Sequence, residues 1–327
     1  MKKRQLGANG PMVSEIGLGC MSFANFFGPT DDETSMECMQ AAVDAGIDFF
    51  DTANIYGMGK SERIVGRFLK ETGADVTLAT KVGIVPGPPR SFNNEADYIR
   101  SELEASLERL NRDKVELYYI HRREAERPVE EVAETMGKLI EEGLIDAWGL
   151  SEVAPGTVRR AHAVTPVCAV QNEYSLWTRV PEMGLTDTCL ELGIAFVAFS
   201  PVARGMFGEK SITPEQIGEK DFRHVNPRFQ RPNWDYNAKA IDGFRAFCHA
   251  KGWTVAAGAI AWVLDRGANQ IPIPGTRTAA HLAEWLGATQ ITLTDTDRAE
   301  IERLLPKGFA HGARYSYAQS LGVESYG

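Results

Sequence analysis

The chain has few cysteines and no arrangement that would pair them. Its five cysteines, at positions 20, 38, 168, 189 and 248, are odd in number, widely spaced and form no C-x-x-C pair. A disulfide framework or a zinc site requires a more regular spacing. The pattern therefore favours reduced thiols in a cytoplasmic protein.

The chain also lacks long apolar runs. No run approaches the about 20 apolar residues that a membrane-spanning helix needs. The N-terminus, MKKRQLG, is charged and has no apolar segment of the kind found in secretory signals. We therefore expect a cytoplasmic protein that has no membrane partner.

The chain has fewer basic than acidic residues. Lysine and arginine total 35 against 44 acidic residues, which gives a net charge of -9. This balance argues against a nucleic-acid-binding surface. The densest basic pair, Arg122-Arg123, is followed by Glu124 and Glu126, which favours a solvated surface of mixed charge.

Apolar residues make up 43% of the 327 positions and follow an alternating pattern. Short apolar runs predict strands, and the segments between them have apolar positions at helical spacing. The predicted strands are residues 16–20, 47–50, 76–80, 115–120, 145–150, 167–171, 194–199 and 270–273. The predicted helices are residues 32–45, 61–70, 95–110, 129–142, 157–163, 182–192, 236–251, 255–264, 279–286 and 295–305.

Eight strand–helix alternations are typical of an α/β protein of the (β/α)8 TIM-barrel type. An Asn-Gly turn at residues 9–10 predicts an N-terminal hairpin within residues 3–18. The first strand–helix turn lacks the third glycine of a G-x-G-x-x-G motif, which disfavours a dinucleotide-binding doubly wound sheet. We expect one domain over residues 1–327, with extra C-terminal helices and an irregular segment at residues 200–235.

Ionisable groups follow three successive strands. Asp51 ends one strand and Tyr56 lies in the glycine-containing loop after it, while Lys81 and His121 end the next two strands. Singly, such residues are more often turn caps, surface charges or packing groups. Because the carboxyl ends of barrel strands meet at one face, the four together predict a single catalytic site.

A set of short motifs accompanies these residues in a fixed order. The motifs are GLG at 17–19, DTANIYG at 51–57, ATK at 79–81, YIHR at 119–122, GLS at 149–151, QNEYS at 171–175, FSP at 199–201 and IPGTR at 273–277. In this order the sequence resembles the aldo-keto reductase family over nearly its whole length. The resemblance implies a barrel with NADPH across its carboxyl end and hydride transfer to an aldehyde or ketone.

The resemblance also implies roles for the four residues. Tyr56 would be the general acid, assisted by Lys81, Asp51 and His121. A free tyrosine, with a pKa of about 10, is a poor acid at pH 7. A nearby ammonium lowers that pKa, and a carboxylate holds the ammonium in place. His121 would orient or polarise the carbonyl group.

Further residues would bind the cofactor by the same resemblance. Ser151 and Gln171 would hold the nicotinamide carboxamide, and Phe199 would stack on the ring. The remaining implied contacts are Met21, Asp51, Ser200, Pro201, Val202, Arg204, Gly205, Gly275, Thr276, Arg277, His281 and Glu284. Arg277 suits the 2′-phosphate, so NADPH is expected over NADH.

Two positions depart from the family pattern. Glu152 and Trp285 stand where the family usually has asparagine, near the carboxamide and the adenine respectively. The apolar cluster of Met21, Phe23, Phe26 and Phe27 is interpreted as substrate-pocket wall, and Tyr174 and Trp177 share that interpretation. The tail with Arg314, Tyr315 and Tyr317 either closes over the site or extends along the surface.

Other functions remain to be weighed. A regulatory or sensor subunit of the same fold would bind NADPH with little turnover. A metal-dependent hydrolase or a lyase on this fold needs ligand clusters at several strand ends, where only His121 stands. The P-loop-like GMGKS at 57–61 lacks the required glycine at position 54. The expected partner is a small carbonyl compound, with a monomer as the expected state.

Overall fold

Eight parallel strands form the centre of the molecule in a computed structural model that describes residues 1–326. Along the sheet they follow one another in chain order. They are β3 (Leu18–Gly19), β4 (Phe49–Asp51), β5 (Thr77–Val82), β8 (Val115–Ile120), β9 (Ile145–Ser151), β10 (Ala169–Glu173), β11 (Ala195–Phe199) and β12 (Gln270–Ile273). Each strand matches a predicted one within a few residues.

The first and last strands meet and join the sheet into a barrel. Gly19 and Gly275 form a parallel bridge, and the amides of Gly17 and Gly19 donate to the carbonyls of Pro272 and Pro274 at 3.0 and 3.1 Å. Added Cβ atoms at Gly17 and Gly19 would approach Phe49 and the Ile273 carbonyl within 3.0 Å, so the seam requires glycine. The predicted (β/α)8 barrel is confirmed.

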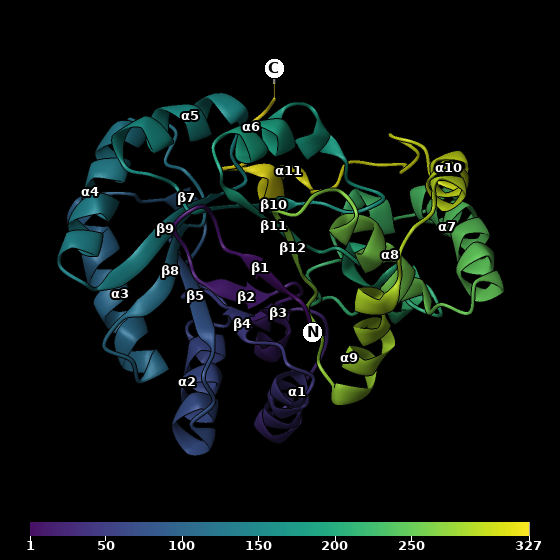
Figure 1. The fold of residues 1–327 in the computed structure, drawn as a ribbon, viewed down its shortest axis with the longest axis horizontal. Helices are drawn as coiled ribbons and strands as arrows, with labels where there is room; N and C mark the ends of the chain where they lie inside the picture. Colours follow the sequence, from purple (N-terminus) through teal and green to yellow (C-terminus); the bar gives the residue numbers. More distant parts are fainter. Residues whose placement is uncertain (327) are drawn as a thin grey trace.

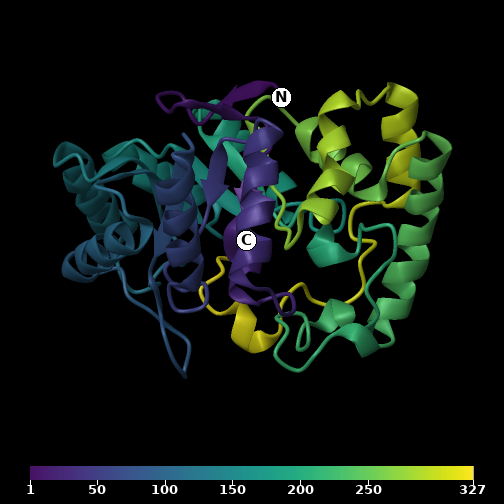
Figure 2. The ribbon, with the colours of Figure 1, turned by 90° about the horizontal axis from the view of Figure 1, so that it is seen from below.

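Helices surround the barrel (Figure 1). Those between strands are α1 (Asp32–Asp44), α2 (Lys60–Thr72), α3 (Ala96–Leu110), α4 (Val129–Glu141), α5 (Pro155–Val164), α6 (Leu185–Glu191), α7 (Asn233–Ala250) and α8 (Val255–Leu264). The helices after the last strand are α9 (Ala279–Leu286), α10 (Asp295–Leu304) and α11 (Tyr317–Ser320). Helices α7 and α10 lie side by side at one edge of the molecule (Figures 1 and 2).

Local sequence signals set the helix boundaries. Asp31 begins α1 by accepting from the amide of Thr34, and Thr294 begins α10 in a capping box with Asp297. Gly73 ends α2 in the left-handed conformation, with φ 67°. These caps explain why the predicted boundaries agree with the observed ones. No helix within residues 1–326 is long and apolar enough to cross a membrane.

The barrel interior is filled at its amino end. The hairpin of β1 (Lys3–Gln5) and β2 (Met12–Ser14) covers this end, and it places Leu6 and Val13 in the interior cluster with Phe49, Leu117 and Val197. Figure 2 shows the hairpin and α11 at opposite ends of the barrel. The predicted N-terminal hairpin is confirmed, and it leaves the carboxyl end of the barrel for the site.

Two elements were not predicted. A second hairpin, β6 (Ile84–Val85) with β7 (Ser91–Phe92), encloses a turn rich in proline and glycine. Its strands are too short to give an alternating pattern. The short helix α11 is likewise below the length at which helical spacing is visible. The predicted irregular segment 200–235 contains short 3₁₀ turns, at Ala203–Gly205, Pro214–Gln216 and Pro227–Phe229, and α7 begins within it at Asn233.

Gly66 marks the point where α2 meets the end of α3. A Cβ at Gly66 would lie 2.5 Å from the carbonyl oxygen of Arg109 and 2.7 Å from the Cα of Leu110. Because backbone atoms cannot rotate away, we expect Gly66→Ala to lower the free energy of unfolding by about 1–3 kcal/mol.

Gly156 in α5 provides the matched control. A Cβ there would have no heavy atom within 4 Å. Gly156→Ala is therefore expected to be neutral or to stabilise the protein by up to about 1 kcal/mol. Urea denaturation measures both variants, and equal stability of the two would contradict the close approach of α2 and α3.

Candidate active site

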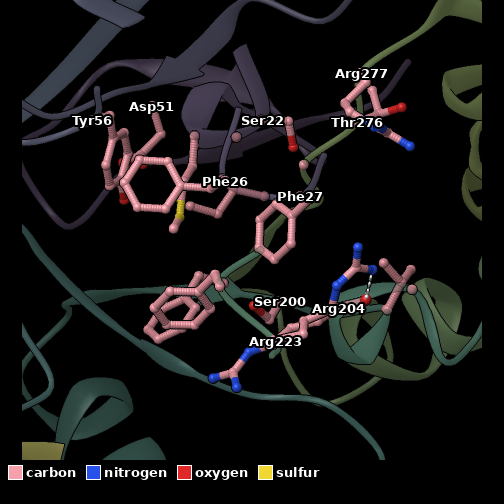
Figure 3. A pocket seen from close by; sticks show the side chains of 18 of the residues that line it. Ser22, Phe26, Phe27, Asp51, Tyr56, Ser200, Arg204, Arg223, Thr276 and Arg277 are labelled. Atoms are coloured by element: carbon pink, nitrogen blue, oxygen red, sulfur yellow. Dashed lines mark hydrogen bonds between the residues drawn. The ribbon is translucent and has the colours of Figure 1, made fainter. Parts of the chain in front are cut away.

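A cavity of about 640 Å³ lies at the carboxyl end of the barrel. Its walls come from the strand ends, the loop after β11, the β6–β7 hairpin and the C-terminal tail. Figure 3 shows Asp51 and Tyr56 at one end, Thr276 and Arg277 at the other, and Phe26 and Phe27 between them.

Asp51 and Lys81 form a buried ion pair beneath the cavity. Lys81 is fully buried, and its ammonium bonds to the Asp51 carboxylate and donates to the carbonyl of Thr52 at 2.6 Å. Gln171 donates to the other carboxylate oxygen of Asp51 at 2.7 Å. Burial raises the pKa of Asp51 and lowers the pKa of Lys81, while the attraction between the two opposes both changes. The pair fixes Lys81 under the tyrosine.

Tyr56 lies against both Lys81 and His121. The Lys81 ammonium is 5.2 Å from the centre of the Tyr56 ring, and the His121 ring meets the Tyr56 ring edge-on at 5.6 Å. The four predicted residues are thus brought together, from the ends of β4, β5 and β8 and from the loop after β4. Tyr56 and His121 line the cavity directly.

Burial keeps His121 neutral. Its pKa is well below the usual range because the ring is buried, and the charges on Arg122, Lys81 and Arg90 lower it further. Its Nδ1 is buried and has no hydrogen-bond partner within residues 1–326. A neutral imidazole retains one N–H, which can donate to a carbonyl oxygen.

The pKa of Tyr56 differs from the expected direction. Burial raises it, the Asp51 carboxylate raises it further, and the charge on Arg122 opposes them. Tyr56 therefore carries its proton at neutral pH, as an acid must.

The predicted cofactor residues gather along the same cavity. Ser151 and Phe199 are the last residues of β9 and β11, and Gln171 lies in the middle of β10. His281 and Glu284 lie on α9. The other predicted cofactor residues that line it are Gly275, Thr276, Arg277, Met21, Asp51, Ser200, Val202, Arg204 and Gly205. Pro201 lies in the turn between lining residues and is buried.

The arginines near the predicted phosphate loop differ in their pairing. The guanidinium of Arg204 pairs with Glu173 at 2.6 Å and also donates to the carbonyl of Arg314 at 2.9 Å. Arg223 pairs with Asp221 at 2.6 Å. Arg277 has no carboxylate within 4.0 Å in the described part of the chain, and it donates only to the carbonyl of Pro29 at 3.3 Å. Among Arg204, Arg223 and Arg277, only Arg277 therefore has a charge that no carboxylate of the described chain compensates.

Glu152 turns away from the cavity. Its carboxylate is fully buried, pairs with Arg314 and accepts from the amide of Glu173 at 2.9 Å. The departure from the family pattern at this position thus places no free anionic group beside Ser151. Trp285 does line the cavity, and its indole N–H is buried with no partner among residues 1–326.

The C-terminal tail closes over the site. Arg314 pairs with Glu152 and with Glu173, the latter at 3.1 Å. Farther along, the amide of Glu324 donates to the carbonyl of Glu152 at 3.0 Å, and Asn172 donates to the Tyr326 hydroxyl at 2.7 Å. These contacts decide between the two conformations left open for the tail.

Two tyrosines of the tail differ in their exposure to solvent. Tyr315 lines the cavity beside Phe222, with ring centres 6.4 Å apart. Tyr317 is 85% exposed and points to solvent. Tyr315 thus forms part of the wall that a substrate would meet.

The prediction that three aromatic residues line the pocket is wrong. Phe23, Tyr174 and Trp177 are buried in the core, where Tyr174 packs on Phe196 and Trp177 packs edge-on against Phe229. Their loops lie at the right end of the barrel, but their side chains point into the layer between strands and helices. Met21, Phe26 and Phe27 line the cavity as predicted.

The prediction of a solvated surface at Arg122 is also wrong. Arg122 is only 6% exposed, lines the cavity and donates to Ser151 at 3.2 Å. Arg90 lines the same cavity and was missed entirely. The available signal was that Arg122 follows His121 at a strand end; nothing in the sequence indicates that the β6–β7 hairpin folds over the site.

No group of three His, Cys, Asp or Glu residues forms a metal-binding arrangement in the part of the chain described, residues 1–326. Fold and site together define a (β/α)8 barrel with a cavity lined by ionisable side chains at the carboxyl end of its strands.

Comparison with known proteins gives the family. The family model described as "Aldo/keto reductase family" matches residues 15–306. A probable aldo-keto reductase 1 from Glycine max is 38% identical over 95% of this chain and 91% of its own length. A Schizosaccharomyces pombe protein named aldo-keto reductase yakc [NADP(+)] is 37% identical over 93% of this chain and 92% of its own. The chain belongs to the aldo/keto reductase family.

Solved structures agree with this assignment. The glycerol dehydrogenase AKR11B4 from Gluconobacter oxydans superposes with a TM-score of 0.85 at 28% identity, covering 93% of this chain and 95% of its own. The holo form of the aldo-keto reductase AKR11C1 from Bacillus halodurans gives a TM-score of 0.79 at 26% identity, covering 98% and 99%.

Arg314 joins the tail to the barrel through ion pairs with both Glu152 and Glu173. Replacing it with methionine leaves Glu152 and Glu173 buried with less compensation, and removing one partner of a buried ion pair costs about 3–5 kcal/mol. Because the last strand of the barrel ends at Ile273, the described part of the tail is not paired into the sheet, and we expect Arg314→Met to expose it. Limited chymotrypsin digestion, followed by mass spectrometry, should show faster cleavage after Tyr315 and Tyr317.

Arg303→Met is the control for this prediction. Arg303 pairs with Glu300 on the exposed face of α10, where such pairs contribute little. Its tail should be cleaved at the wild-type rate. A wild-type cleavage rate in Arg314→Met as well would show that the ion pairs do not hold the tail.

Proposed function

We propose that the protein is an NADPH-dependent carbonyl reductase that converts an aldehyde or ketone to the alcohol, reversibly. The observation that carries this proposal is the contact of Tyr56 with both Lys81 and His121 at the wall of a cavity that extends to an unpaired Arg277. The NADP(+) in the name of the yeast relative supports the choice of cofactor.

The residues along the cavity fit the cofactor by their chemistry. Ser151 and Gln171 offer polar groups for a carboxamide, Phe199 offers a ring face, and Arg277 offers an unpaired cation for a 2′-phosphate. Glycines at 205 and 275 leave room for a close approach of backbone to phosphate. When bound, NADPH supplies the hydride that adds to the carbonyl carbon.

The protein supplies the proton and the orientation. The neutral His121 donates a hydrogen bond to the carbonyl oxygen and holds it near Tyr56. As negative charge develops on that oxygen, the Tyr56 hydroxyl gives it a proton and becomes a phenolate. The charges of Lys81 and Arg122 stabilise the phenolate until solvent returns the proton. Asp51 keeps Lys81 charged and in position.

The second candidate is a sensor that binds NADPH with little turnover. It would use the same cavity and the same residues, so no structural observation favours it over the reductase. Steady-state assay with 4-nitrobenzaldehyde separates them, because a sensor binds NADPH tightly and does not oxidise it.

Tyr56→Phe tests the proton donor. Removing a general acid lowers kcat by about 10²- to 10⁴-fold, and we expect a fall of that size on the best substrate found in a panel of aldehydes, ketones and quinones. The dissociation constant for NADPH, measured by fluorescence quenching, should stay the same. Tyr317→Phe changes an exposed tyrosine and should leave kcat unchanged. Wild-type kcat in Tyr56→Phe would exclude Tyr56 as the acid.

Arg277→Ala tests the cofactor choice. A hydrogen bond to a charged group contributes about 1.5–3 kcal/mol, so KM for NADPH should rise about tenfold or more. KM for NADH, which lacks the 2′-phosphate, serves as the internal control and should change little. A wild-type enzyme with equal preference for the two cofactors would contradict the assignment.

A further inference from the structure

Arg122 is a buried arginine that pairs with no carboxylate among residues 1–326. Its Nη1 donates to the carbonyl of His121 at 2.5 Å and to the hydroxyl of Ser151 at 3.2 Å. Its Nε is buried and has no hydrogen-bond partner within residues 1–326. The side chain lines the cavity next to the predicted reaction centre.

Arg90 approaches the same place from a different element. It lies in the turn of the β6–β7 hairpin, lines the cavity, and packs over the Phe92 ring at 5.6 Å. Its Nε is also buried without a partner in the described chain. Over residues 1–326, neither Arg90 nor Arg122 has a carboxylate oxygen within 4.0 Å, unlike the paired Arg204 and Arg223.

The two guanidinium groups act on one another and on His121. Burial lowers the pKa of both His121 and Arg90. The charges of both arginines lower the pKa of His121 further, and the charge of Arg122 lowers that of Arg90 further. Arg122 follows His121 directly in the chain, and Arg90, His121 and Arg122 all line the same cavity. The carboxylate of Asp51 is already occupied by Lys81 and Gln171. The reaction centre therefore carries an excess of positive charge.

The expected cofactor does not neutralise this charge. Its carboxamide, expected beside Ser151, is uncharged. Its phosphates are expected at Arg277 and the loop after β11, and Figure 3 shows Arg277 across the cavity from Tyr56. A partly buried pair of cations without counter-charge is unfavourable, and it favours binding of an anion there.

We propose that Arg90 and Arg122 form a subsite for a carboxylate carried by the substrate, so that the preferred substrates are oxo acids. This inference rests on the proposed reductase function. Arginine forks match the two oxygens of a carboxylate, and charge-assisted bonds of this kind are strong. Phe222 and Tyr315, on the same cavity wall, would contact the apolar body between the carboxylate and the carbonyl group.

Matched acid and ester substrates test the subsite. The 2-, 3- and 4-carboxybenzaldehydes place the carboxylate at three distances from the carbonyl, and their methyl esters remove only the charge. We expect kcat/KM for at least one acid to exceed that of its ester by about 10- to 100-fold. Arg90→Gln should lower this acid-to-ester ratio by a similar factor, and Arg90→Lys should retain part of it.

Arg67→Gln is the control for a lost positive charge. Arg67 pairs with Glu71 on the exposed face of α2, outside the residues that line the cavity. Its acid-to-ester ratio should equal that of the wild type. Thermal melting of Arg90→Gln checks that the variant is folded. Equal kcat/KM for acids and esters in the wild type, or an unchanged acid-to-ester ratio in Arg90→Gln, would overturn the subsite. Either result would leave the reductase function intact.

A binding experiment separates failure of the subsite from failure of the proposed function. Benzoate and benzamide are titrated calorimetrically into the protein with saturating NADP⁺, so that the phosphate-binding arginines are occupied. Benzoate should bind about tenfold or more tightly than benzamide, and Arg90→Gln should remove the difference. If no aldehyde is reduced, the reductase function fails, but this difference still supports the anion subsite; equal binding of the two probes overturns it.

Discussion

The ammonium of Lys81 is the charge around which the site is organised. A lysine with no exposed surface remains charged only beside a counter-ion, and Asp51 provides it from the next strand. Gln171 holds the remaining oxygen of Asp51 from across the barrel. One polar network thereby connects three strands. Tyr56 lies above this network, with its ring against the Lys81 ammonium. The barrel geometry and the acid–base chemistry are two aspects of this single arrangement.

A second buried network attaches the outer parts of the chain to the barrel. Glu152 and Glu173, at the ends of neighbouring strands, receive Arg204 from the loop after β11 and Arg314 from the tail. Loop and tail have few regular hydrogen bonds of their own, so these charge pairs determine where they lie. The glutamate at position 152, which departs from the family pattern, has a structural role as an anchor.

The sequence predicted the barrel and the four central residues because both depend on local and periodic signals. Strand runs and helical spacing give the alternation, and the carboxyl ends of parallel strands must meet at one face. The direction of a side chain in a loop has no such rule. Tyr174 and Trp177 were therefore placed in the cavity although they pack into the core.

Side-chain positions that depend on contacts distant in sequence were also not predicted. Arg123 and Glu124, the sequence neighbours of Arg122, indicate a surface charge, but groups distant in sequence bury Arg122. The position of Arg90 depends on how the β6–β7 hairpin folds over the barrel, and the position of Tyr315 depends on ion pairs with Glu152 and Glu173. No periodic pattern encodes those partners.

The seam between β3 and β12 has a consequence for how the protein reaches its native state. The bridge from Gly19 to Gly275 joins segments near opposite ends of the chain, and contacts of such high sequence separation form slowly. Until they form, the sheet has two open edges and an exposed apolar inner face, which is a state prone to aggregation. Arg277 follows directly after this seam. The segment that carries Arg277 therefore takes its place only when this long-range seam forms, so an incompletely closed barrel would hold Tyr56 beside Lys81 without Arg277 across the cavity.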